Sequence, residues 1–171
     1  MEFPFELPKI TEFSNQGHTI LGRALAYATS YESNCKTLAS LIGFKHDHSI
    51  LNKEDHLNEF LAFMQKRKLF AHIEDIIKKT NLPHSIPEML HKGREARNFI
   101  AHESSIGVFQ LFESDDRAFI IKDIRKKIIE IAEANMAVLI LGQKITNEPI
   151  PTLSYLNSYS ESVAEWVCRI E

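Results

Sequence analysis

The chain has 171 residues, of which 44% are hydrophobic and 25% are charged, as in an ordinary soluble globular protein. This length suffices for one hydrophobic core, so we expect a single domain over residues 1–171. The formal net charge of −3 excludes a surface that is basic all over, and any nucleic-acid site must therefore be a local patch.

Cysteine use and the pattern of apolar residues bear on the cellular compartment. Cys35 and Cys168 lack a C-x-x-C spacing, and a disulfide framework is not expected from two such residues. The first residues lack the basic and apolar segments of a secretory signal, and no apolar run approaches the length of a membrane span. We therefore expect a cytoplasmic protein without a membrane partner.

Helical periodicity dominates the first part of the chain. After an N-terminal extension over residues 1–15, apolar residues recur at steps of three and four from Thr19 to Gly43, where Gly43 is predicted to end the first helix. Residues 45–52 are expected to form a polar loop. A second helical region covers residues 53–79. Its apolar phase slips across residues 65–68, which leaves open one long helix or a break at this point.

The later elements are predicted from the same pattern. Asn81-Leu82-Pro83 ends the second region, and Pro87 suits the first turn of a helix that extends to about Glu103. Val108–Phe112 could form a strand or pack as a loop. Asp115 or Asp116 can cap a helix that ends near Lys144. Residues 147–151 form a linker, and an accessory helix lies within residues 152–171.

Strong alternation with a period of two residues is absent, so a large sheet is not expected. Long amphipathic helices with short or moderate connections predict an all-α fold, an antiparallel (up-and-down) bundle of four to five main helices. The glycines are widely separated, which argues against a P-loop or Rossmann phosphate site, and no Gly-x-Ser-x-Gly elbow indicates a serine hydrolase.

The segment Arg97-Asn98-Phe99-Ile100-Ala101-His102 carries the most distinctive chemistry of the chain. Residues four apart share a helix face, so Arg94, Asn98 and His102 are expected to form a polar stripe with Arg97 beside it. Ala96, Phe99 and Ile100 are expected to turn toward the core.

These residue types point to chemistry on a phosphodiester, because a guanidinium binds phosphate as a rigid fork and an imidazole exchanges a proton near neutral pH. From residue types alone, the alternative is a solvated helix end whose cations stabilise the helix dipole.

The pattern Arg97-Asn98-x-x-x-His102, late in a helix of an all-helical chain, resembles the signature of the HEPN superfamily. That signature is Arg followed after four to six residues by His, often with a polar residue directly after the Arg. The order of long helices on either side is similar, and the resemblance covers most of residues 19–144. It implies a HEPN-like fold and a metal-independent endoribonuclease of the toxin or phage-defence type. The alternative within the family is a non-catalytic module that binds RNA, nucleotide or a protein partner.

The resemblance also implies roles for individual residues. Arg97 would bind phosphate, His102 would be the acid or base, and Asn98 would be the supporting polar residue. Arg94 is a candidate only because it lies one turn upstream. Family members commonly act as homodimers with the site at the interface, so we expect RNA and a second copy as partners, with a neutralising antitoxin as a further possibility. No cofactor and no metal are expected.

Other polar groups have weaker functional signals. His46, Asp47, His48, Asp55 and His56 could be metal ligands, but their spacing matches no structural zinc pattern and a solvated loop is expected. The basic concentrations over residues 65–68 and 117–127 are expected to be solvated faces, or RNA-backbone contacts if they border the Arg97 groove.

A few further residues remain open. His91 lies one turn before Arg94 and is expected on the surface. Glu32 and Ser33 are polar residues of the first helix that could face the motif, but the sequence does not select them. Tyr27, Tyr31 and Trp166 fit apolar helical phases and are expected in the core or at an interface.

Overall fold

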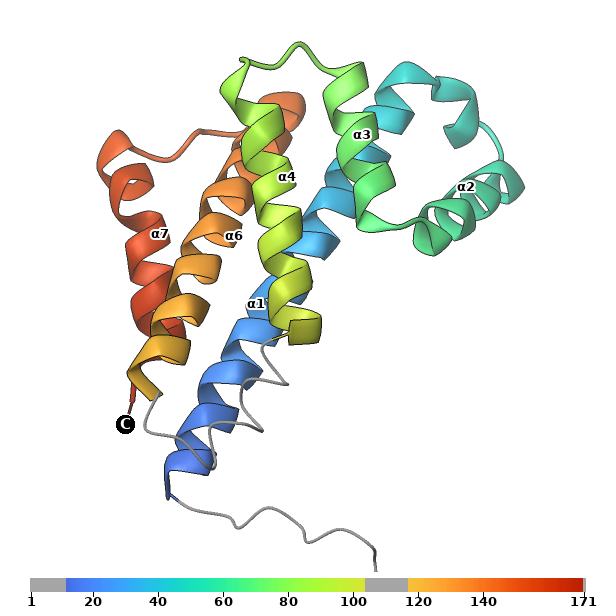
Figure 1. The fold of residues 1–171 in the computed structure, drawn as a ribbon. Helices are drawn as coiled ribbons and strands as arrows, with labels where there is room; N and C mark the ends of the chain where they lie inside the picture. Colours follow the sequence, from blue (N-terminus) through green and yellow to red (C-terminus); the bar gives the residue numbers. More distant parts are fainter. Residues whose placement is uncertain (1–11, 104–116, 171) are drawn as a thin grey trace, which may run out of the picture.

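The structure is a computed structural model that describes residues 12–103 and 117–170 (Figure 1). Within these ranges the chain is all-α, as predicted, with six α-helices and no strand. The α-helices are α1 (Glu12–His46), α2 (Glu54–Lys66), α3 (Leu69–Lys79), α4 (Ser85–Asn98), α6 (Arg117–Thr146) and α7 (Leu153–Cys168). A 3₁₀ helix, η1 (His48–Leu51), follows α1, and a π-helical turn, η2 (Phe99–Glu103), follows α4. Val108–Phe112 and the capping candidates Asp115 and Asp116 lie outside the described residues.

Helix α1 is longer than the sequence pattern predicted at both ends. It begins at Glu12, within the expected N-terminal extension, and it continues through Gly43 to His46. One face of α1 is buried along most of its length because its apolar residues keep a helical period. The buried residues of this face are Ile20, Ala24, Ala28, Tyr31, Cys35, Leu38 and Ile42.

Gly43 serves close packing and does not end α1, which corrects its predicted role. A Cβ atom at this position would lie 2.8 Å from the Phe60 ring of α2. The Phe60 ring also packs against Phe44, with ring centroids 5.0 Å apart. None of the glycines in the described ranges has a positive φ. The missing side chain therefore lets α2 approach α1 after the helix has passed this point.

The region over residues 53–79 is two helices, so the phase slip marks a break. Arg67 and Lys68 have extended backbone between the end of α2 and the start of α3. The Arg67 guanidinium pairs with Asp75 and donates to the Ala71 carbonyl oxygen at 3.2 Å. These contacts join the corner to α3. The expected loop over residues 45–52 is also partly helical, because Asp47 caps η1 by accepting a hydrogen bond from the Ser49 N–H.

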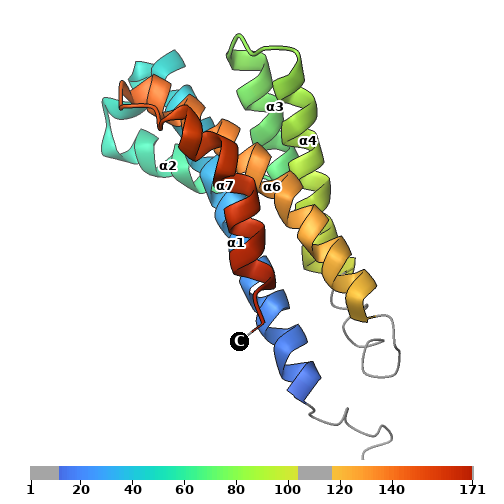
Figure 2. The same cartoon turned by 90° about the vertical axis from the view of Figure 1, so that its left-hand side faces the viewer.

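The helices are arranged around α1 and α6. Helix α4 packs against α6 and lies antiparallel to it, and α7 packs against α6 and also runs opposite to it (Figures 1 and 2). Helix α3 packs against α1 and α4, and α2 lies near the C-terminal end of α1. Arg23 of α1 donates to the Arg169 carbonyl oxygen at 2.8 Å, so the end of α7 lies against the first half of α1.

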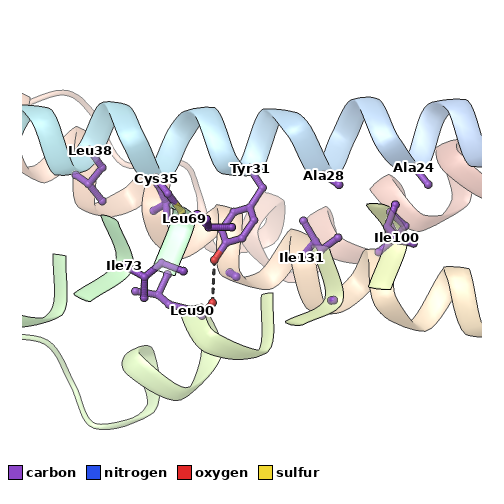
Figure 3. Close-up of a cluster of buried hydrophobic side chains, with 14 of the residues drawn as sticks. Ala24, Ala28, Tyr31, Cys35, Leu38, Leu69, Ile73, Leu90, Ile100 and Ile131 are labelled. Atoms are coloured by element: carbon purple, nitrogen blue, oxygen red, sulfur yellow. Dashed lines mark hydrogen bonds between the residues drawn. The ribbon is translucent and has the colours of Figure 1, made fainter. Parts of the chain in front are cut away.

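Tyr31 fixes α4 against α1 (Figure 3). Its side chain is fully buried, and its hydroxyl donates to the Leu90 carbonyl oxygen at 2.9 Å. One turn further along α4, a Cβ at Gly93 would lie 2.4 Å from the Ala134 Cβ of α6 and 3.0 Å from the Tyr31 hydroxyl. Helix α4 therefore packs closely against both neighbours just before its predicted site residues.

Helix α7 corresponds to the accessory helix expected within residues 152–171. Ala164 and Val167 are buried in the same hydrophobic cluster as residues of α1 and α6. Trp166 is 53% exposed, so it is not a core residue of this chain. Across the described ranges, no helix combines the length and the apolar character needed to cross a bilayer.

Candidate functional site

The last turns of α4 and the π turn after it carry all four predicted site residues. Arg94, Arg97 and Asn98 lie in α4, and His102 lies in η2. Ala96 and Ile100 are fully buried, which confirms their predicted direction toward the core. Arg94, Arg97 and Asn98 are partly exposed, and His102 is exposed.

Arg97 is partly buried and is bound by a carboxylate from α1. Its guanidinium forms an ion pair with Glu32, and the two side chains are 24% and 35% exposed, respectively. The Arg97 Nη1 also donates to the Asn98 side-chain oxygen at 3.4 Å. Partial burial reduces screening by salt, so this pair restricts the guanidinium more than a surface pair would. Because a guanidinium has five N–H donors, it can bind a phosphate while still paired with Glu32.

The structure thus selects Glu32 from the two polar residues of α1 that the sequence left open. Ser33 is exposed, and Glu32 faces α4. The only sequence signal was that Glu32 directly follows Tyr31, which has an apolar helical phase. The sequence does not reveal which residue beside Tyr31 contacts Arg97, because this depends on how α1 is rotated relative to α4. Packing between the helices sets that rotation.

The π-helical turn changes how His102 is placed relative to Arg97. In an α-helix, residues five apart point in different directions around the axis. In a π turn, hydrogen bonds join residues five apart, which widens the turn. Side chains five residues apart then point in more similar directions around the helix axis. Most of the step from Arg97 to His102 passes through η2. Single π turns within helices are frequent at functional sites.

Arg94 turns toward α3 and meets an aromatic ring. Its guanidinium carbon lies 5.6 Å from the centroid of the Phe70 ring, and its Nη2 lies 3.3 Å from Glu95. The Arg94 Nε is buried and has no hydrogen-bond partner among the described residues. The sequence suggested Arg94 by spacing alone and did not indicate its contact with Phe70.

His91 also lies at the edge between α3 and α4. Its ring centroid is 5.9 Å from that of Phe70, and its Nε2 is 3.5 Å from the Glu74 carboxylate. Glu74 in turn pairs with Lys78 at 3.1 Å. His91 is therefore a partly buried residue next to the candidate site, where a surface residue was expected.

The two basic concentrations are partly solvated, since Lys66, Lys68, Lys122 and Lys126 are exposed, and partly paired with acidic groups of the fold. Arg67 pairs with Asp75, and Arg125 pairs with Glu161 of α7. Lys127 is the described basic residue that contacts the motif, with its Nζ 5.9 Å from the centroid of the Phe99 ring and 2.8 Å from Glu130.

Two of the five residues considered as metal ligands, His46 and Asp47, have other hydrogen-bond partners in the structure. Asp47 caps η1, and the His46 Nε2 lies 3.2 Å from the Lys79 carbonyl oxygen. Within residues 12–103 and 117–170, no three His, Cys, Asp or Glu side chains come together as a metal-binding group.

A mostly apolar cavity of about 380 Å³ lies between α1, α6 and α7. Its lining includes Leu38, Leu139, Gln143 and Tyr159 but none of the four predicted site residues. The polar groups at the end of α4 therefore do not line this cavity.

Comparisons of the chain with protein-family models, with curated proteins and with solved structures give no match. What the site can do chemically follows from its own side chains. Arg97 offers a restrained guanidinium, His102 offers an exposed imidazole, and Arg94 offers a second cation next to an aromatic ring. These groups can bind an anion and transfer a proton.

Proposed function

We propose that this chain is a metal-independent endoribonuclease with a HEPN-like helical bundle, in which Arg97 and His102 act on RNA. The observation that supports this most is the state of Arg97. It is a partly buried guanidinium restrained by Glu32 and Asn98, and it precedes an exposed His102 by one π-containing turn. Cleavage of a phosphodiester requires a restrained cation and a proton-transfer group that act on the same phosphate.

In the proposed reaction the 2′-hydroxyl of RNA attacks the adjacent phosphorus, and the bond from phosphorus to the 5′-oxygen breaks. A base takes the proton from the 2′-hydroxyl, and an acid gives a proton to the departing 5′-oxygen. The products are a 2′,3′-cyclic phosphate and a free 5′-hydroxyl. Histidine suits both proton transfers, and Arg97 stabilises the negative charge that builds on the phosphoryl oxygens.

One chain supplies one motif histidine, whereas the reaction has two proton transfers. A two-fold homodimer would supply a second His102 to the same site. The exposure of His102 at the end of α4 supports this arrangement, because the side chain is accessible to a second copy. In this proposal the protein is a cytoplasmic toxin or phage-defence nuclease, and an antitoxin protein would act by covering the same surface.

RNA cleavage in the presence of EDTA tests the proposal. Wild-type protein should cleave RNA, and Arg97→Ala and His102→Ala should each reduce the rate by roughly 10²-fold or more. His56→Ala is the matched control, because His56 is an exposed histidine of α2 and should leave the rate unchanged. Loss of cleavage in EDTA, or full activity of His102→Ala, would overturn the proposal. In the host cell, expression of the wild type should slow growth, and His102→Ala should relieve this effect.

The second candidate is a non-catalytic helical module that binds RNA, nucleotide or a protein partner. The ion pair of Arg97 with Glu32 favours the protein-binding form of this candidate, since a carboxylate at the guanidinium competes with an incoming phosphate. RNA that binds but stays intact with wild type and with both variants would establish this candidate in place of the nuclease.

A further inference from the structure

An exposed aromatic ring lies next to the proposed phosphate-binding residue. Phe70 of α3 is 51% exposed and lies at the edge between α3 and α4. Its ring contacts two groups of α4, the Arg94 guanidinium at 5.6 Å and the His91 ring at 5.9 Å. We refer to Phe70, His91 and Arg94 together as the Phe70 platform.

The Phe70 platform lies within reach of a nucleotide bound at Arg97. Arg94 and Arg97 are three residues apart on one helix, which is about 4.5 Å along its axis. The base and the phosphate of one nucleotide are separated by several ångströms, so the same nucleotide, or its neighbour in the strand, can contact both residues. The Arg94 side chain is 25% exposed, so part of it is accessible to such a ligand.

The chemistry of the platform fits an unpaired base. Proteins that bind single-stranded nucleic acid stack bases on exposed aromatic rings, and arginine adds a cation–π contribution. A duplex offers no such contact, because its bases are stacked on each other inside the helix. The exposed aromatic ring thus favours a single strand, and the neighbouring cations add attraction for its phosphates.

We infer that the Phe70 platform stacks an unpaired base of the RNA strand whose phosphate binds at Arg97, and that it restricts the substrate to single-stranded RNA. This inference rests on the proposed function, since it places the RNA at Arg97. Carboxylates surround the platform, with Glu32 at Arg97, Glu95 at Arg94 and Glu74 at His91. They limit the electrostatic attraction of phosphates, so stacking provides a large part of the binding.

Two other exposed aromatic residues are less suited to this role. Phe63 lies 5.2 Å from the Arg67 guanidinium, but that guanidinium is paired with Asp75 at the corner between α2 and α3. Trp166 lies on α7, which packs against α6. Both residues therefore serve as controls.

The test uses a tryptophan placed in the platform as a fluorescent reporter of stacking. Trp166 is the only tryptophan of the chain, so Phe70→Trp combined with Trp166→Phe leaves a single tryptophan, located in the platform. Both positions are about half exposed, and both changes should leave the fold intact. The ligand is a single-stranded 2′-O-methyl oligouridine, which cannot be cleaved because its 2′-oxygen is blocked.

The single-stranded oligonucleotide should quench the fluorescence of the tryptophan in the platform. It should leave the fluorescence of Trp166 in the wild type unchanged. The duplex form of the oligonucleotide should quench neither tryptophan. Phe70→Ala should weaken binding by about 5- to 150-fold, and Phe63→Ala should have no effect. The salt dependence should be shallow, with a slope of about −1.4 in log K against log salt for two phosphate contacts. Absence of quenching, equal quenching at both positions, or quenching by the duplex would overturn the inference.

The quenching test of the Phe70 platform and the cleavage test of the ribonuclease proposal can succeed or fail independently. Quenching of the platform tryptophan in a protein that never cleaves RNA would support the platform and contradict the nuclease. Cleavage of RNA without any quenching would support the nuclease and contradict the platform.

Discussion

At the scale of single residues, the contact between Glu32 and Arg97 would have two opposing effects on the phosphate of the proposed substrate. The carboxylate restrains the guanidinium, which favours catalysis because a positioned charge stabilises a transition state without reorganisation. It also repels the negative phosphate, which weakens binding. Since the pair is partly buried, both effects are larger than at an exposed pair.

Glu32→Gln separates these effects. We expect kcat for RNA cleavage to fall about tenfold or more, because the guanidinium loses a charged partner, while KM falls or stays the same because a repelling charge is gone. Glu32→Asp should recover part of kcat. The matched control is Glu95→Gln, which removes the exposed partner of Arg94. An unchanged kcat in Glu32→Gln would show that Glu32 does not position Arg97.

At the scale of helices, the position of the site depends on how closely α4 packs against its neighbours. Gly93 lies at the contact of α4 with α1 and α6, less than two turns before Asn98. A displacement of α4 at this point would move Arg97 relative to Glu32. The stability of the fold and the geometry of the site are therefore linked through one glycine.

Gly93→Ala should destabilise the protein by about 1–3 kcal/mol, because the added Cβ would lie 2.4 Å from the Ala134 Cβ, which cannot rotate away. This cost exceeds the gain of about 1 kcal/mol in helix propensity. Gly22→Ala is the control: a Cβ there meets nothing within 4 Å, so the same substitution should stabilise α1 by up to about 1 kcal/mol. Urea unfolding measures both changes, and equal stability of the two variants would refute the packing argument.

The elements could be predicted from the sequence to the extent that their apolar residues repeat. The periodicity of residues 19–43 and the role of Pro87 indicated helices that the structure contains, although α1 extends further at both ends. Gly43 was misinterpreted because a glycine that accommodates a neighbouring ring and a glycine that ends a helix look alike in sequence. The break at Arg67 was left open because its contact with Asp75 forms only after the chain has turned.

The same reasoning applies to the candidate site. Arg97, Asn98 and His102 were identified because their spacing along one helix is visible in the sequence. Glu32 and Phe70 come from α1 and α3, and no local pattern connects them to the motif. The π turn was also not foreseen, because its residues, Phe99 to Glu103, have no composition that distinguishes them from an α-helix.

At the scale of the whole molecule, a site that needs two copies of His102 should depend on protein concentration. In dilute solution, where the dimer dissociates, the rate of RNA cleavage should rise with about the square of the chain concentration. At higher concentration the rate should become proportional to concentration. Light scattering over the same range should show the dimer forming where the dependence changes. A linear dependence throughout, with a monomer by scattering, would exclude a shared site.

The stability of the whole chain should depend on pH through His72. This α3 residue is 2% exposed, and burial lowers its pKa below the ordinary value of 6.5, with further lowering by the nearby charges of Arg67 and Lys36. Asp75 and Glu32 oppose the shift but do not cancel it. The folded chain therefore keeps His72 neutral at pH values where the unfolded chain binds a proton.

Because the pKa of His72 is lowered in the folded chain, the contribution of this residue to the free energy of unfolding is fully present above pH 6.5. It is lost as the pH falls below this value. The loss is at most about 1.4 kcal/mol per pH unit for one group. Urea unfolding one pH unit above and one pH unit below 6.5 measures the difference in the free energy of unfolding. This difference should be smaller in His72→Leu. A pH dependence that is the same in His72→Leu would assign the effect to other groups.

The central claim is that Arg97 and His102 cleave RNA through its own 2′-hydroxyl. It is tested most directly by identifying, by mass spectrometry, the ends of RNA incubated with the protein in EDTA. We expect 2′,3′-cyclic phosphate and 5′-hydroxyl ends with the wild type, and no such ends above background with His102→Ala. Uncut RNA with the wild type, ends of another kind, or the same products with His102→Ala would contradict the account.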